Sequence, residues 1–196
     1  SAHWLSKNSI EETMIFAKEL KKGLESGQEK KSKGMLLTAT LTEINGGTSH
    51  NVTPKECVST FDIRIPVDTN CKIVEQKISV LVNEIAQRRK VEAYYSIIDE
   101  TEPFEAPHDS AIVRAFTLGI MDVEHTRPTL IRKTGTGDMN VIGNQWNIPV
   151  VTYGPGDPHE AHTIDERVSI DEYLRGIEIL KRMIHHLKRL HDKNIQ

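Results

Sequence analysis

The sequence predicts an α/β protein, built as a split βαβ (ferredoxin-like) sandwich followed by the C-terminal part of a second α/β domain. In the first half of the 196 residues, helix and strand signals come in the order α-β-β-α-β. This is the order of a split βαβ sandwich without its first strand. The second half alternates helix, strand, helix, strand and helix, which implies parallel strands and right-handed crossovers. Because it supplies two strands, whereas sheets usually have about 4–6, we expect it to be the tail of a larger domain.

The first predicted helix begins at Ser9 and ends near Ser26-Gly27. Ser9-Ile-Glu-Glu12 has the pattern of a capping box, in which the serine hydroxyl and the glutamate carboxylate accept from amides of the first turn. Apolar residues then recur at helical spacing and give the helix one inward face. They are Ile10, Met14, Ala17, Leu20 and Leu24.

Two strands are predicted at 35–44 and 57–65, because apolar and polar residues alternate along both. Asn45-Gly46-Gly47 ends the first strand, and Ser49 to Pro54 makes the connection too long for a tight hairpin turn. The inward positions are Met35, Leu37, Ala39 and Leu41 in the first strand and Phe61, Ile63 and Ile65 in the second.

A second helix is predicted after Pro66, with Asp68 or Thr69 as its N-cap. Residues 91–98 then alternate like a third strand. The helix carries apolar residues at Val74, Ile78, Leu81, Val82 and Ile85.

An acidic, proline-containing connector at 99–107 separates these elements from the second half. Polar connectors that contain proline are typical of domain boundaries. We therefore expect one domain at 1–100 and a second at 101–196.

The middle of the second half predicts two strands and a short helix. Leu130-Ile131 is a short strand, and Ile148–Thr152 has the apolar character of a buried one. Between them, Thr136 or Asp138 can cap a short helix that runs from Met139 towards Gly143.

Two longer helices flank this region. Asp109 is the expected N-cap of the first, and Ser169-Ile-Asp-Glu172 is a capping box at the start of the last. The first carries its apolar residues at Ile112, Val113, Phe116 and Ile120. We expect the inward face of the last helix to consist of Ile170, Tyr173, Leu174, Ile177, Leu180, Ile184 and Leu187.

Composition excludes several classes of function. The net charge of −3 gives no electrostatic footprint for nucleic acid or an anionic membrane. No stretch approaches the ~18–20 apolar residues of a membrane span, and Ser1-Ala-His-Trp-Leu-Ser lacks the basic start and apolar run expected of a signal peptide. Two cysteines are too few for a disulfide scaffold, which predicts a reducing, cytoplasmic location.

The stretch 131–166 is the first candidate for a site, because it alternates glycine-rich loops with one apolar strand. Loops beyond strand ends are where α/β proteins usually carry their chemistry. His162 could ligate a metal, with Asp165 and Glu166 orienting its ring, or be an ordinary loop histidine. One ligand does not make a site, and the sequence has no HExxH or HxD motif.

Three further features each fit a binding role or a structural one. The amides of Thr134-Gly-Thr-Gly-Asp138 could hold an anion at a helix N-terminus, or form a capped turn. Arg132 and Lys133 could bind a carboxylate or lie in solvent. Taken singly, Asn51 and Arg64 fit loop capping and a surface charge better than substrate contacts.

Five motifs in a fixed order carry a resemblance to a known family: Gly47-Thr-Ser-His-Asn-Val-Thr-Pro54, Phe61-Asp-Ile-Arg-Ile-Pro66, Gly135-Thr-Gly-Asp-Met-Asn140, Tyr153-Gly-Pro-Gly156 and Ala161-His-Thr-Ile-Asp-Glu166. They resemble the C-terminal part of the co-catalytic dizinc aminoacylase and carboxypeptidase superfamily, which includes acetylornithine deacetylase and succinyl-diaminopimelate desuccinylase. The run from Leu130 to Asn140 is closest to one branch, the LysW-lysine/LysW-ornithine hydrolases of lysine and arginine biosynthesis.

The resemblance assigns roles to single residues. His162 matches the last metal ligand of the family, and Asn51 matches a residue that often acts across a dimer interface. The family usually has serine where this chain has Gly137, which puts a side-chain contact there in doubt. The implied substrate-binding residues are Asn51, Arg64, Lys133, Thr134, Gly135, Thr136 and Gly154.

The same resemblance implies an architecture and a reaction. Residues 1–100 would be a lid that forms a homodimer through its sheet edge or helices, and 101–196 the end of a zinc-peptidase-type catalytic domain. The reaction would be hydrolysis by two zinc ions, or cobalt, of an acyl or carrier-protein γ-glutamyl amide, releasing lysine or ornithine.

The remaining catalytic parts of the family, including its general base, would lie upstream of Ser1. We therefore expect no catalytic residue in this chain and no activity from it alone. The alternatives are a non-catalytic dimerisation or binding fragment, and a generic deacylase or dipeptidase of the same superfamily.

Overall fold

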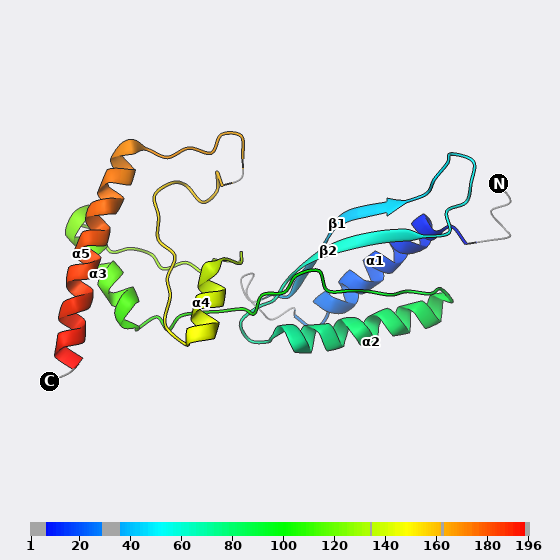
Figure 1. The fold of residues 1–196 in the computed structure, drawn as a ribbon, viewed down its shortest axis with the longest axis horizontal. Coiled ribbons are helices and arrows are strands. Elements are labelled where there is room, and N and C mark those ends of the chain that lie inside the picture. The colour runs from blue at the N-terminus through cyan, green and yellow to red at the C-terminus, as the bar shows by residue number, and fades with distance from the viewer. Residues whose placement is uncertain (1–6, 29–35, 134, 162, 195–196) are drawn as a thin grey trace. The chain divides into compact units, whose positions relative to one another are not determined.

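A computed structural model describes four stretches of the chain: 7–28, 36–133, 135–161 and 163–194. The chain forms two compact units, residues 1–103 and 104–196 (Figure 1). The division falls within the acidic connector. The first unit combines helices with paired strands and the second contains helices joined by irregular segments, and the mixed α/β class predicted from the sequence is confirmed.

The first unit contains helices α1 (Ser9–Glu25) and α2 (Cys71–Arg89) and strands β1 (Thr38–Gly46) and β2 (Cys57–Arg64). The strands pair antiparallel, from Thr38 opposite Arg64 to Gly46 opposite Cys57. Helix α1 packs against both strands and against α2. These four elements were predicted, and their bounds lie within a few residues of the expected ones.

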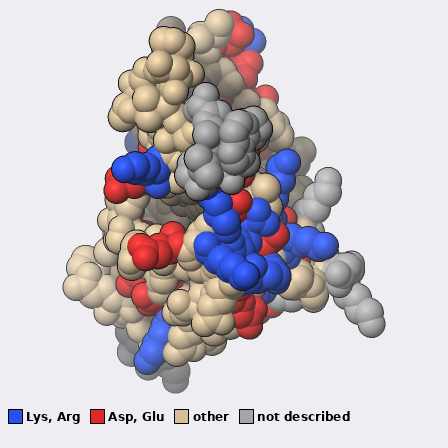
Figure 2. Space-filling model, turned by 90° about the vertical axis from the view of Figure 1, so that its right-hand side faces the viewer, with Lys and Arg blue, Asp and Glu red and all other residues tan. Residues whose placement is uncertain are grey.

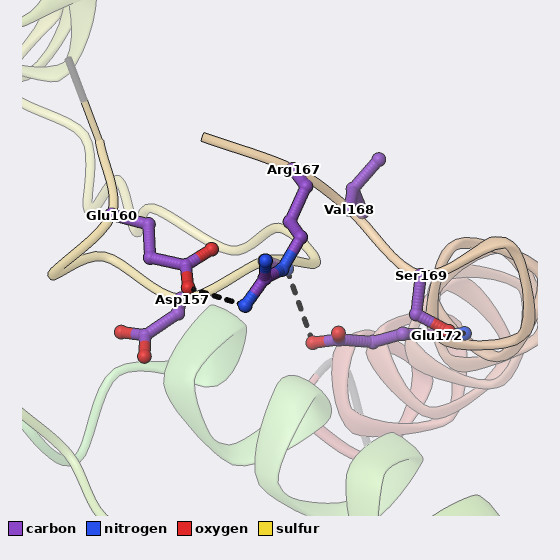
Figure 3. Close-up of a pocket in the computed structure, with 7 residues that line it drawn as sticks. Asp157, Glu160, Arg167, Val168, Ser169 and Glu172 are labelled. Atoms are coloured by element: carbon purple, nitrogen blue, oxygen red, sulfur yellow. Dashed lines mark hydrogen bonds and ion pairs between the residues drawn. The ribbon is translucent and has the colours of Figure 1, made fainter. Parts of the chain in front are cut away.

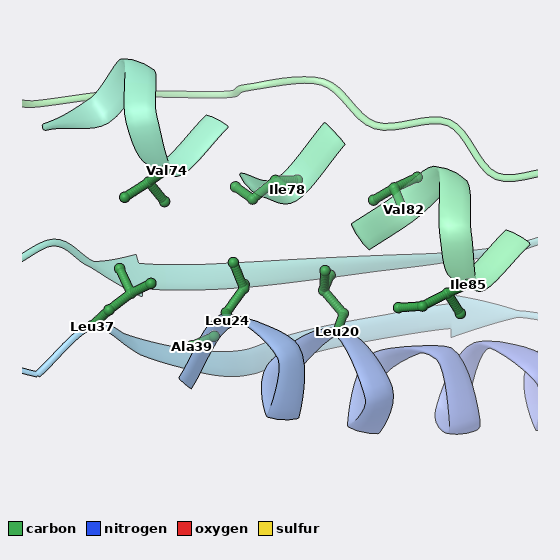
Figure 4. Packing of buried hydrophobic residues seen from close by; sticks show 8 residues of the cluster. All are labelled: Leu20, Leu24, Leu37, Ala39, Val74, Ile78, Val82 and Ile85. Atoms are coloured by element: carbon green, nitrogen blue, oxygen red, sulfur yellow. The ribbon is translucent and has the colours of Figure 1, made fainter. Parts of the chain in front are cut away.

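The core of the first unit lies between these elements, where side chains of α1 and α2 point toward one another (Figure 4). Alternation in β2 is confirmed, since Phe61 and Ile63 pack on this core while Asp62 is exposed. Leu41 was predicted to point inward but is exposed, and the bulge between Leu41 and Glu43 ends the regular alternation of β1 there. The core residues are Leu20, Leu24, Leu37, Ala39, Val74, Ile78, Val82 and Ile85.

Both helices of this unit begin on an asparagine that the sequence analysis did not select. Asn8 caps α1, its side-chain oxygen accepting from the amides of Ile10 and Glu11. Ser9, the predicted cap, is already helical, and its hydroxyl donates to the backbone oxygen of Lys55 instead. Asn70 caps α2, its side-chain oxygen accepting from the amide of Ile73, although Asp68 or Thr69 was the predicted cap. Several neighbouring residues could cap each helix, and the loop conformation selects one.

Charged side chains join the two helices on the outside. Basic and acidic side chains lie beside one another on the face seen in Figure 2. Arg89 of α2 pairs with Glu12 of α1 at 2.7 Å and approaches Glu19 at 3.6 Å. This contact keeps the pKa of the Arg89 guanidinium above its ordinary value, chiefly through the hydrogen bond to Glu12.

Residues 91–98 were predicted to be a strand, and the structure shows irregular backbone there, without strand pairing. Val91 and Ala93 are half-buried, alternating with exposed Glu92 and Tyr94, and Ala93 packs against the core. Within the described residues, the sheet of this unit has two strands, β1 and β2. The predicted alternation therefore holds over 91–94 but not over 95–98, where every residue is exposed, and a strand also needs a hydrogen-bonding neighbour.

The second unit contains α3 (Ala111–Glu124), α4 (Asp138–Trp146) and α5 (Ile170–Asn194). All three helices were predicted, although α4 extends beyond the expected end at Gly143. Ser110, rather than Asp109, stands at the N-cap of α3, without a side-chain hydrogen bond. Helix α4 follows Gly137, whose amide donates to Asn140 Oδ1 at 3.2 Å. The predicted strands 130–131 and 148–152 are unpaired in the part of the chain that the structure describes.

Helix α5 packs against α3 through a face that the sequence analysis did not select. Gly176, Ile179 and Met183 are buried there. The predicted inward face is wrong, because six of its residues are exposed and the seventh, Leu187, is half-buried. The exposed ones are Ile170, Tyr173, Leu174, Ile177, Leu180 and Ile184.

A polar contact also joins these two helices. His186 of α5 lies 2.7 Å from Asp122 of α3. The hydrogen bond from His186 lowers the pKa of the Asp122 carboxyl, and the charges of His186, Arg182 and Arg189 add to this. Among the described helices, none is long and apolar enough to cross a membrane.

Candidate functional site

The start of α5 is joined to the Tyr153-Gly-Pro-Gly156 loop by one carboxylate (Figure 3). Ser169 Oγ accepts from the amide of Glu172 at 3.4 Å, which is the predicted half of the capping box. The other half is replaced, because Glu172 Oε1 accepts from the amide of Gly156 at 3.1 Å. Glu172 therefore bonds a loop distant in sequence rather than its own helix end.

A surface hollow of about 310 Å³ lies beside this contact. Arg167 Nη2 donates to Glu160 Oε1 at 3.1 Å across it (Figure 3). Three carboxylates and one guanidinium face the hollow, so its formal charge is negative. Its lining residues are Gly156, Asp157, Glu160, Arg167, Val168, Ser169 and Glu172.

Tyr153 fixes the other end of the loop. Its ring lies 5.2 Å from the ring of Phe116 on α3. Burial raises the pKa of the Tyr153 hydroxyl, and the charges of Glu124 and Glu172 raise it further. The phenol therefore stays neutral at physiological pH and acts as an apolar anchor with a polar tip.

Two of the expected substrate contacts belong to the first unit, where each has a local partner. Asn51 is exposed in the β1–β2 connection, and its Oδ1 accepts from the Ser49 hydroxyl at 2.9 Å. Arg64 ends β2, and its Nε and Nη2 both donate to Asp62 Oδ2, at 3.0 and 2.7 Å. Both residues therefore bond to side chains two positions away, as expected if Asn51 and Arg64 have structural roles.

The other expected contacts belong to the second unit. Lys133, Thr136 and Gly154 are exposed, and Gly135 is half-buried. Thr134 and His162 lie outside the described residues, so the structure does not test their assigned roles.

A metal centre is not assembled by the described residues alone. Among them, no three histidine, cysteine, aspartate or glutamate side chains come close enough to hold a metal ion. Zinc in proteins takes three or four such ligands. The donor set of the described part of this chain therefore does not fit a zinc ion on its own.

The residues that organise this region were mostly missed in the sequence. Glu172 was recognised as part of a capping box, but its bond to Gly156 could not be predicted from helix signals. Tyr153 stood within a recognised motif without a role, and Arg167 was not selected.

Cys71 is poorly suited to act as a nucleophile. Cys71 is buried at the start of α2, and its backbone amide donates to Glu102 Oε2 at 3.0 Å. Burial raises the pKa of the Cys71 thiol to about 11, and the negative charge of Glu102 adds to the rise. The thiolate that a nucleophile requires is therefore scarce at neutral pH.

We expect iodoacetamide at pH 8 to alkylate half-buried Cys57 at least about ten times faster than Cys71. With a pKa of about 11, raising the pH to 10 should speed the alkylation of Cys71 about 100-fold, because the thiolate fraction rises by that factor. Mass spectrometry of the native protein measures both rates, with Cys57→Ser to isolate Cys71. Equal rates for the two cysteines at pH 8 would contradict the buried, neutral thiol.

Comparison with known proteins places these residues in context. The model of peptidase family M20/M25/M40 matches residues 11–186. The chain is 32% identical over 137 residues to a LysW-lysine/LysW-ornithine hydrolase of Saccharolobus islandicus, covering 70% of this chain and 37% of that protein. It is 42% identical over 94 residues to a Thermococcus kodakarensis protein provisionally named for the same activity, covering 48% of this chain and 27% of that protein. The chain thus spans well under half the length of these relatives.

Two solved structures share the fold. An M20 family metallo-carboxypeptidase from Sulfolobus solfataricus superposes with a TM-score of 0.66 at 17% identity, over 93% of this chain and 45% of that one. The aminopeptidase PepT of Bacillus cereus superposes with a TM-score of 0.69 at 19% identity, over 89% of this chain and 45% of that one. At these identities the likeness concerns the fold alone.

Proposed function

Because the chain belongs to peptidase family M20/M25/M40, we propose that it is the C-terminal part of a metal-dependent amidohydrolase. The proposed substrate is lysine or ornithine held in amide linkage on a carrier protein or another acyl group. The observation that carries the proposal is the 32% identity to a LysW-lysine/LysW-ornithine hydrolase over 70% of the chain. A cytoplasmic location and a part in lysine and arginine biosynthesis belong to the same proposal.

Within this proposal, His162 contributes one imidazole to a metal site, and the other ligands come from outside the described residues. A zinc or cobalt ion held there would supply Lewis-acid activation of a water molecule. Lys133, Thr134, Gly135, Thr136 and Gly154 line the substrate pocket.

Arg64 and Asn51 would bind the substrate carboxylate. Two N–H groups of Arg64 are already engaged with Asp62. A substrate carboxylate would therefore take the remaining guanidinium hydrogens or displace Asp62. Asn51 lies at the exposed connection between β1 and β2, a position from which it could serve the partner subunit of a homodimer.

A second candidate is a dimerisation or binding module without catalysis. The described residues form no metal site on their own, and they do not include His162. The 196-residue chain alone is expected to lack amidase activity under both proposals, so the decisive experiment uses the whole protein.

The test replaces His162 with alanine in the whole protein, with His159→Ala as the matched control. His159 is an exposed histidine of the same loop. We expect His162→Ala to lower the rate of LysW-lysine hydrolysis more than about 100-fold and to reduce the zinc content, because one metal ligand is lost. His159→Ala should retain the wild-type rate and zinc content. Full activity and zinc content in His162→Ala would refute the proposal, and faster hydrolysis of acetylornithine than of LysW-lysine would favour the generic deacylase.

A further inference from the structure

Resting on the part of the proposed function that makes this chain one portion of a longer protein, we propose that α5 packs on a β-sheet supplied by the rest of that protein. The packing surface is the apolar face of α5 that α3 leaves uncovered, and segment 148–152 is one strand of the sheet. The exposed residues of this face are Ile170, Tyr173, Leu174, Ile177, Leu180 and Ile184.

Helix α5 has two apolar sides, and α3 covers one of them (Figure 1). Ile179 and Met183 are buried on that side. With about 3.6 residues per turn, the six exposed residues lie roughly 130° around the helix from these two. Charged residues such as Arg182 occupy the third side. A surface helix carries one apolar stripe, whereas a helix that is apolar on two sides is typically covered from two directions.

The uncovered face has the properties of a buried surface. Six large apolar side chains are exposed in one stripe, which runs from the first turn of α5 to Ile184. Soluble proteins rarely leave contiguous apolar patches of this kind open to water, and such patches mark surfaces that bind protein. We therefore infer that another part of the protein covers this face.

Segment 148–152 reaches the same helix. Just after it, Pro155 Cδ lies 3.9 Å from the position that a Cβ on Gly176 of α5 would take. Val150 and Val151 are half-buried, but 148–152 forms no strand pair with any described residue. Helices in α/β proteins cover the faces of sheets whose strands are themselves apolar. An unpaired apolar segment beside an uncovered helix face therefore indicates that neighbouring strands come from outside the described residues.

The length of related proteins points to the source of these strands. Two solved structures share the fold over 93% and 89% of this chain, and the matched part is 45% of each of them. More than half of each of those proteins therefore lies outside the matched part. A second copy of this chain is the alternative occupant, but the rest of a longer protein accounts for the open helix face and the unpaired segment together.

The experiment compares the 196-residue chain with the whole protein by two measurements. The first is hydrogen exchange of the backbone amides in 148–152 of the unsubstituted proteins, followed by mass spectrometry. The second is alkylation of Ile184→Cys by iodoacetamide, with Arg182→Cys as the matched control. Ile184 is 63% exposed on the open face and the Arg182 side chain is 57% exposed on the charged side, so the two cysteines start with similar access.

In the whole protein, we expect the amides of 148–152 to exchange at least about 100 times more slowly than in the 196-residue chain, because they gain strand partners. Alkylation of Ile184→Cys should slow at least about 10-fold, because the sheet covers it, while Arg182→Cys keeps its rate.

Equally fast exchange of 148–152 in both proteins would overturn the proposal, whatever the variants show. Slow alkylation of Ile184→Cys in the 196-residue chain, rising to the rate of Arg182→Cys on dilution, would overturn it in favour of a second copy. A whole protein that shows both slow rates but hydrolyses no LysW-lysine would refute the proposed activity and leave this packing in place.

Discussion

Replacing Leu24 with alanine is expected to lower the free energy of unfolding of the first unit by about 3 kcal/mol. Leu24 is fully buried, at 0% exposure, between α1 and the neighbouring elements of the core. Removing a buried leucine side chain loses its transfer free energy and leaves a cavity, which together cost about 2–5 kcal/mol. Urea denaturation followed by circular dichroism measures the change.

Met14→Ala is the control for this prediction. Met14 lies on the same helix but is 49% exposed, so its removal leaves no closed cavity. We expect a change below about 1 kcal/mol. If the two variants unfolded at the same urea concentration, Leu24 would not occupy the core position that the structure gives it.

The first unit could be predicted well because its signals are local. Leu20 and Leu24 recur at helical spacing, and Phe61 and Ile63 alternate, so each element's inward face is encoded in its own sequence. Capping was predicted less well. Asn8 and Ser9 are both good N-cap residues, and the choice depends on the contact of Ser9 with Lys55, which is remote in sequence.

Predicted strands failed where pairing depends on another segment. Residues 91–98 and 148–152 carry the apolar character of strands, but a strand is a property of two hydrogen-bonded segments. The described residues supply no partner for them. Sequence pattern alone gives the conformation of a segment and says nothing of its neighbour.

The prediction of the inward face of α5 was wrong for a different reason. The helix carries two apolar faces, a longer one that includes Leu174 and Ile177 and a shorter one with Ile179 and Met183. A count of apolar residues therefore predicts that the longer face points inward. Packing on α3 selects the shorter one, because Gly119 of α3 allows close approach to the backbone of Ile179 and Met183, and a glycine contributes nothing to an apolar count.

The motifs around the candidate site could be recognised in the sequence, but the tertiary contact that joins them could not. The glycine loops and Ser169 were recognised from residue type and spacing, whereas the bond from the Gly156 amide to Glu172 is tertiary. Glu172 was assigned to its own helix end because a capping box usually closes locally. The contacts that support a loop are therefore the part that sequence reasoning missed.

Replacing Gly119 with alanine is expected to lower the free energy of unfolding of the second unit by about 2 kcal/mol. An alanine Cβ at this position would lie 2.9 Å from the backbone nitrogen of Met183 and 3.0 Å from the carbonyl oxygen of Ile179. Both are backbone atoms of α5, so the two helices must separate, and such overpacking costs about 1–3 kcal/mol. The higher helix propensity of alanine offsets up to about 1 kcal/mol of this.

Gly176→Ala separates this clash from the general effect of replacing a helical glycine. Gly176 is also buried on α5, but the nearest atoms to its added Cβ are Tyr153 Oη at 3.8 Å and Pro155 Cδ at 3.9 Å, which is ordinary contact. We expect this variant to be as stable as the wild type or up to about 1 kcal/mol more stable, since only helix propensity changes. Thermal denaturation of both variants measures the difference. Because the two substitutions are chemically identical, equal stabilities would show that α3 and α5 do not approach closely at Gly119.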